Sequence, residues 1–140
     1  MAANTQPIFS NQGFIKWGSA INAANPILDG TGTVNTIATG NAAGNNAGNF
    51  IQKIIARPLG TNVASVARIF INNGSANTTA ANNALMAEIT LPASTLNQAG
   101  AMGGIEISLN LVLPASYNIN VTLGTAVAAG WIFTAIGGQY

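Results

Sequence analysis

Two stretches in the last third of the chain decide the fold: Ile105-Glu-Ile-Ser-Leu-Asn-Leu-Val-Leu113 and Tyr117-Asn-Ile-Asn-Val-Thr-Leu123. Apolar and polar residues alternate through most of each stretch. Because successive side chains of a β-strand point to opposite faces, this alternation predicts two antiparallel strands. Each strand is expected to turn one face to a core and the other to water or a neighbour. The residues from Pro114 to Ser116 predict a tight connection between the strands.

Six further stretches have strand character, although their alternation is less regular. They are Gly13–Ile21, Thr33–Thr39, Phe50–Pro58, Ala64–Asn72, Leu85–Leu91 and Trp131–Ile136. Turn residues separate them at intervals of roughly 8 to 15 residues, a spacing typical of sandwiches and jelly rolls. The alanine-rich segment 76–86 favours a turn or two of helix at most, because Asn, Thr and Ser interrupt it. The sequence therefore predicts an all-β, antiparallel, jelly-roll-like sandwich of about eight short strands.

We expect one sandwich domain over residues 13–140, preceded by an extended N-terminal arm over residues 1–12. No shift in composition divides the chain further. The alternation assigns a set of apolar residues to the core: Ile54, Ile69, Ile71, Ile89, Ile107, Leu109, Ile119, Val121 and Phe133.

Charge is scarce: only seven of 140 residues are charged, and the chain has no histidine and no cysteine. General acid–base and nucleophilic chemistry at neutral pH depends on such groups, so we predict no catalytic residue, no metal site and no cofactor. The net charge of +1 gives no electrostatic attraction to nucleic acid or to an anionic membrane. The N-terminus has no signal-peptide pattern, and the uncharged stretch 123–136 is too short for a spanning helix.

The few charges are expected to form ion pairs that fix strand register. Glu88 and Glu106 alternate with apolar neighbours and so belong to the polar faces of their strands. Pairs with Arg57, Arg68 or Lys53 are the favoured interpretation. A glycosidase-like pair of carboxylates is the alternative.

A surface with so little charge favours self-association. Candidate interface residues are Pro7, Ile8 and Phe9 in the arm, together with Trp17 and Tyr140. Aromatic side chains such as these commonly anchor protein interfaces. The arm is expected to dock on a neighbouring subunit or to fray, with equal weight.

Three segments carry a resemblance to a known family: Arg57 to Gly74, Thr122 to Trp131 and the ending Ala135-Ile-Gly-Gly-Gln-Tyr140. Together with the Ala/Asn/Thr/Gly bias, they resemble small virion proteins of tailed bacteriophages, in particular capsid decoration (cement) proteins. The resemblance implies a non-enzymatic protein of the virion that forms homotrimers and binds the major capsid protein on the outside of the head. The alternative is a carbohydrate- or receptor-binding sandwich of a phage tail or head fibre. That alternative predicts aromatic side chains exposed in loops and a calcium site at Asp29.

Overall fold

The computed structural model describes residues 12–42 and 48–140 and contains, in this part of the chain, eight strands and one short 3-10 helix. The strands are β1 (Gln12–Trp17), β2 (Asn35–Thr39), β3 (Asn49–Pro58), β4 (Ser65–Asn72), β5 (Asn83–Leu91), β6 (Ile105–Leu113), β7 (Asn118–Leu123) and β8 (Trp131–Gln139), and the helix is η1 (Ala80–Asn82). Each of the eight predicted stretches forms a strand. The alanine-rich segment forms one turn of 3-10 helix and then enters β5.

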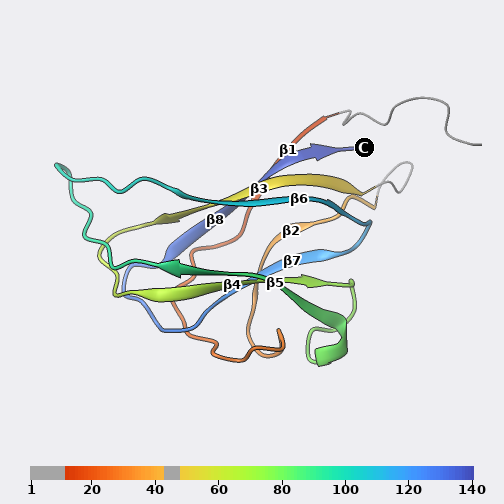
Figure 1. Ribbon diagram of the computed structural model, residues 1–140, viewed down its shortest axis with the longest axis horizontal. Coiled ribbons are helices and arrows are strands. Elements are labelled where there is room, and N and C mark those ends of the chain that lie inside the picture. The colour runs from red at the N-terminus through yellow and green to blue at the C-terminus, as the bar shows by residue number, and fades with distance from the viewer. Residues whose placement is uncertain (1–11, 43–47) are drawn as a thin grey trace, which may run out of the picture.

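The strands form two antiparallel four-stranded sheets that pack face to face, as the two layers of Figure 1 show. The order is β1-β8-β3-β6 in the first sheet and β2-β7-β4-β5 in the second. Strand β4 therefore pairs with β5, β3 with β6, β2 with β7 and β1 with β8. These pairs are those of one long antiparallel hairpin that is folded over into two sheets. This arrangement is a jelly roll, and the predicted fold class is confirmed.

The core lies between the two sheets and contains the residues that the alternation assigned to it. Ile54, Ile69, Ile107, Ile119, Val121 and Phe133 are buried, and Ile71, Ile89 and Leu109 are partly buried against the same cluster. Trp131 and Leu113 are also fully buried there. Burial of each large side chain stabilises the fold by about 1.5–3 kcal/mol, so this layer is the main source of stability.

Two strand ends differ from the prediction by more than two residues. Strand β8 continues through Gly137 and Gly138 to Gln139, although the glycines were expected to end it. A Cβ on Gly137 would lie 1.8 Å from the carbonyl oxygen of Phe50, so the glycine permits close approach of two backbones within the sheet. Strand β1 ends at Trp17, four residues early, and Ile21 instead forms an isolated bridge with Trp131.

Strand β7 is buried on both faces, which corrects the prediction of a half-buried strand. Asn120 and Thr122 on its outer face are as buried as its core residues. The segment between β1 and β2 (residues 18–34) covers this side: Ala24 bridges Leu123, and Gly30 lies against the outward-facing Phe70. Figure 1 shows this segment running beneath the second sheet. A long covering loop of small residues has no period, so the sequence did not indicate it.

Asparagine amides take the place of charges on the second sheet. Thr39 donates a hydrogen bond to Asn118 (2.7 Å), and Asn72 donates to Asn83 (2.9 Å), so that polar side chains bond across neighbouring strands. Asn77 donates to the carbonyl of Gly32 and ties the covering segment to the η1 region. These neutral bonds satisfy part of the outer face of this sheet, which also carries the ion pair of Arg68 with Glu88.

The predicted arm lies almost wholly outside the described residues. Gln12, its expected last member, belongs to β1 and pairs with Gln139 of β8. The sandwich therefore begins one residue before the predicted boundary.

Candidate interaction face

The two sheets have outer faces of different character. The outer face of the second sheet is covered by residues 18–34 and is rich in amides. The outer face of the first sheet, β1-β8-β3-β6, carries no such cover in the described part of the chain. We call it the bare face.

Strand alternation determines which side chains the bare face presents. Phe14, Ile54 and Phe133 are buried and point inward. Their sequence neighbours therefore point outward. The outward set contains seven large apolar side chains: Ile15 and Trp17 on β1, Phe50 and Ile55 on β3, Val112 on β6, and Ile132 and Ile136 on β8.

The strand register brings these residues together in rows across the sheet. Ile15 lies opposite Ile136, and Trp17 lies opposite Thr134, which in turn lies opposite Ile55. Trp17 is 62% exposed, the highest value among the large apolar side chains of the described residues. The predicted interface anchor Trp17 thus stands on the same face as these apolar residues, with Thr134 between it and Ile55.

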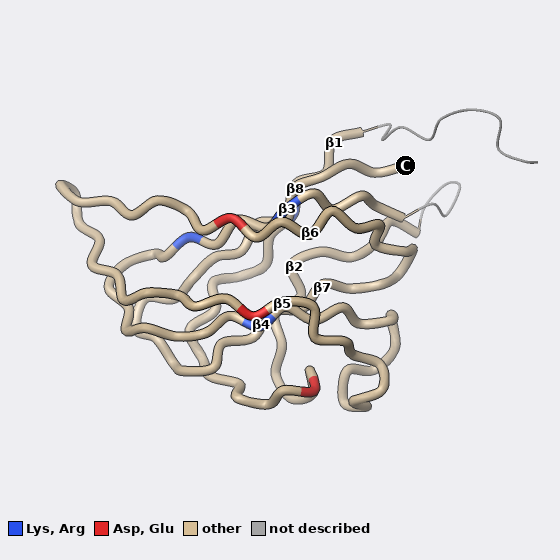
Figure 2. Tube along the Cα trace, viewed as in Figure 1, with Lys and Arg blue, Asp and Glu red and all other residues tan. Residues whose placement is uncertain are grey.

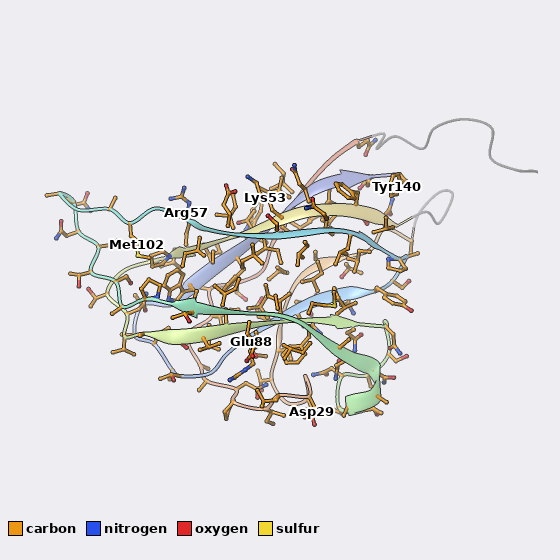
Figure 3. All side chains as sticks on the ribbon, viewed as in Figure 1. Asp29, Lys53, Arg57, Glu88, Met102 and Tyr140 are labelled. Carbon is orange, nitrogen blue, oxygen red and sulfur yellow. The ribbon has the colours of Figure 1, made fainter. Side chains whose placement is uncertain are left out.

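One ion pair lies on this face. Lys53 Nζ of β3 contacts Glu106 Oε1 of β6 at 2.8 Å, and the two side chains are 29% and 59% exposed. Figure 2 shows how few charged positions the whole chain has, and Figure 3 shows Lys53 and Arg57 on the side of the first sheet that faces away from the second. In this exposed setting the pair contributes at most about 1 kcal/mol to stability, but it leaves the middle of the face without a lone charge.

The second predicted pair is on the opposite side of the molecule. Arg68 Nε of β4 contacts Glu88 Oε1 of β5 at 2.8 Å, directly across the strand pair. Arg57 has no carboxylate partner within the described residues. Of the three possible cation partners named from sequence, Arg68 pairs with Glu88 and Lys53 pairs with Glu106.

The other interface candidates are Tyr140 and the arm residues. Tyr140 is partly buried, and its backbone N–H donates to the carbonyl of Gly48. Pro7, Ile8 and Phe9 lie outside the described residues. Of the interface candidates within the described residues, Trp17 lies on the bare face in β1, and Tyr140 directly follows β8.

The side chains that could bind a metal or act as acid and base lie apart from one another in the described residues. Across residues 12–42 and 48–140 there is no cluster of three or more metal-ligating side chains. Asp29 accepts hydrogen bonds from the hydroxyl and the backbone N–H of Thr31, and these bonds lower the pKa of its carboxyl. Glu88 and Glu106 belong to different sheets and face outward on opposite sides, so they do not form the pair that a glycosidase needs.

A recess of about 160 Å³ lies between the covering segment and β7. It is lined by residues 20–25 and 33–35 with Val121 and Thr122, all of them uncharged.

No helix in the described residues has the length and apolar character needed to cross a membrane.

Comparison with known proteins adds no assignment. No protein-family model matches the chain, and neither does any curated protein or solved structure.

Proposed function

We propose that this chain is a structural protein that assembles with copies of itself and forms part of a virion, as a capsid decoration or head-stabilising protein. The observation that carries the proposal is the bare face: seven outward apolar side chains on one sheet of a protein with only seven charged residues. A surface of this kind is uncommon on a monomer and typically marks an interaction site.

The fold and the charge distribution support the same proposal. Jelly rolls build many viral capsid proteins, although they also build lectins and cupins, so the fold alone is an argument by analogy. Exposed neutral amides such as those of Asn22 and Asn73 hydrogen-bond to water on the rest of the surface and add no net charge to it. A protein that packs at high density on a shell benefits from this, because like charges on neighbouring copies would repel.

The proposed role requires no reaction. The three carboxylates of the chain, Asp29, Glu88 and Glu106, lie far apart in the fold and each has a structural partner. Stabilisation of a larger particle would come from apolar burial between subunits and across the shell. The major capsid protein is the proposed second partner.

Mass spectrometry of particles purified from cells that carry the gene tests this function. We expect the chain to remain with the particles through density-gradient purification, in amounts comparable with the main shell protein. Its absence from intact particles would contradict the virion assignment. Retention on immobilised glycans by a chain absent from particles would favour the carbohydrate-binding alternative instead.

A further inference from the structure

We propose that the bare face is the self-association surface, and that it packs against the bare face of a second copy across a two-fold axis. This inference rests on the proposed function, because it names the surface and the partner through which the chain would assemble.

The two free edges of the first sheet, β1 and β6, are poorly suited to self-pairing. On edge strand β1, Lys16 lies on the inward side, where it borders a recess lined by residues 36–39 of β2. On edge strand β6, Asn110 has a φ of 48° and breaks the regular ladder next to a shift in register. Inward charges and bulges are the features by which sheet edges avoid adding strands from other chains. Self-association through the first sheet is therefore expected at its bare face and not at its edges.

Three of the exposed large apolar side chains lie on the bare face: Ile15, Trp17 and Val112. The other exposed large apolar residues come two at a time along the chain: Ile27 and Leu28, Leu59 and Val63, and Leu85 and Met86. A ring of three copies needs two different complementary patches on each chain, whereas a two-fold contact needs one patch that complements itself. The extended apolar surface found here matches the second case.

The charges on the face are compatible with a self-contact. Lys53 and Glu106 neutralise each other within one copy, and Arg57, the remaining charge of this face, is exposed next to the end of β3 and not in the middle of the face. A two-fold axis would bring one such neutral pair from each copy into the contact, with both signs available on both sides. Burial of paired charges costs far less than burial of an isolated charge, so the pair does not prevent docking.

The area of the bare face determines how stable the dimer is expected to be. Four strands spaced about 4.8 Å apart and roughly 20–30 Å long present about 400–600 Å² of sheet per copy. Two copies together would bury on the order of 1,000 Å², close to the lower limit of specific interfaces. We therefore expect a dimer that dissociates on dilution.

The test compares full-length variants by light scattering over a range of concentrations. Trp17→Lys and Val112→Lys place a charge at opposite sides of the face, at positions 62% and 52% exposed, so the fold tolerates them. Leu85→Lys makes the same chemical change on β5 of the other sheet and is the matched control. We expect the wild type and Leu85→Lys to reach twice the chain mass of 14.1 kDa. Trp17→Lys should raise the dissociation constant roughly 30-fold or more, as for an interface hot spot.

The outcomes separate this inference from the proposed function. A wild-type chain that stays monomeric at high concentration contradicts self-assembly itself. A wild-type oligomer that resists both face variants, or that dissociates with Leu85→Lys instead, overturns the choice of face only. A mass of three chains overturns the two-fold contact. A face that becomes available only after removal of residues 2–9 would show that the arm, and not a second copy, occupies it.

Discussion

Asn62 is the strongest single test of the idea that buried amides replace charges in this fold. It is 3% exposed and lies where three loops meet. Its Oδ1 accepts hydrogen bonds from the backbone N–H groups of Ala129 (2.9 Å) and Gly130 (2.8 Å). Its Nδ2 donates to the carbonyl of Gly130 at 3.1 Å, with longer contacts to Gly60 and Ser94. One side chain thus joins the residues before β8, the turn after β3 and the start of the loop after β5.

Replacement of this side chain by alanine removes the acceptor for two backbone N–H groups. The N–H of buried Gly130 then costs about 1–3 kcal/mol as an unsatisfied donor, and the other lost bonds cost about 1 kcal/mol each. We expect Asn62→Ala to lower the free energy of unfolding by about 3–5 kcal/mol, a large part of a typical total. Urea unfolding followed by circular dichroism measures this loss, which should lower the midpoint by about 1 M or more.

Two further variants make the result specific. Asn22→Ala, at an exposed position, should change stability by less than about 0.5 kcal/mol. Asn62→Asp keeps an acceptor for both N–H groups and removes the amide donor, so it separates the two roles of this side chain. A loss below about 1 kcal/mol for Asn62→Ala would refute the reasoning, because water would then satisfy the backbone N–H groups that Asn62 accepts from.

Three other outcomes follow from the charges and the arm. Glu88→Gln and Glu106→Gln should each lower the free energy of unfolding in urea by about 1 kcal/mol or less, and Glu88→Gln should have the larger effect because its partner Arg68 is the more buried. The double variant should still assemble, and loss of assembly in a folded double variant would contradict this expectation. Stability should be nearly constant from pH 5 to 9, because no histidine or cysteine titrates there. The hydrogen bonds from Thr31 lower the pKa of Asp29, so its contribution to stability is present above the ordinary value of 3.8 and is lost as the pH falls through its folded pKa. An unfolding transition near neutral pH would contradict these expectations. Removal of residues 2–9 should leave the far-ultraviolet spectrum unchanged and weaken assembly or particle binding; an unchanged mass and unchanged particle occupancy would exclude a role for the arm.

The sequence predicted the strands well because their signal is local. In Ile105–Leu113 the alternation of apolar and polar residues shows which face of the strand is buried, and strand β6 has the predicted first and last residues. The glycines of β8 misled the prediction, because a glycine that ends a strand and a glycine that permits close packing of Phe50 look alike in one dimension. The burial of Phe70 under Gly30 depends on a contact between segments 40 residues apart, and no local pattern records it.

The candidate site was predictable only in part, for a related reason. Trp17 stood out by its size and its place near a chain end, but Ile15, Ile136 and Ile55 were each interpretable as core. They become a face only when the register aligns β1, β8 and β3. Lys53 was one of three possible partners for Glu106, and the pairing of β3 with β6 selected it.

The most direct test of the central claim is the exposure of Trp17 in the unmodified chain. The protein has two tryptophans, and Trp131 is fully buried in the core, so quenching of fluorescence by acrylamide reports Trp17. If the bare face packs on a second copy, Trp17 should be protected from acrylamide at high protein concentration and become accessible as the protein is diluted. Full accessibility of Trp17 at every concentration, with the chain folded throughout, would contradict the account.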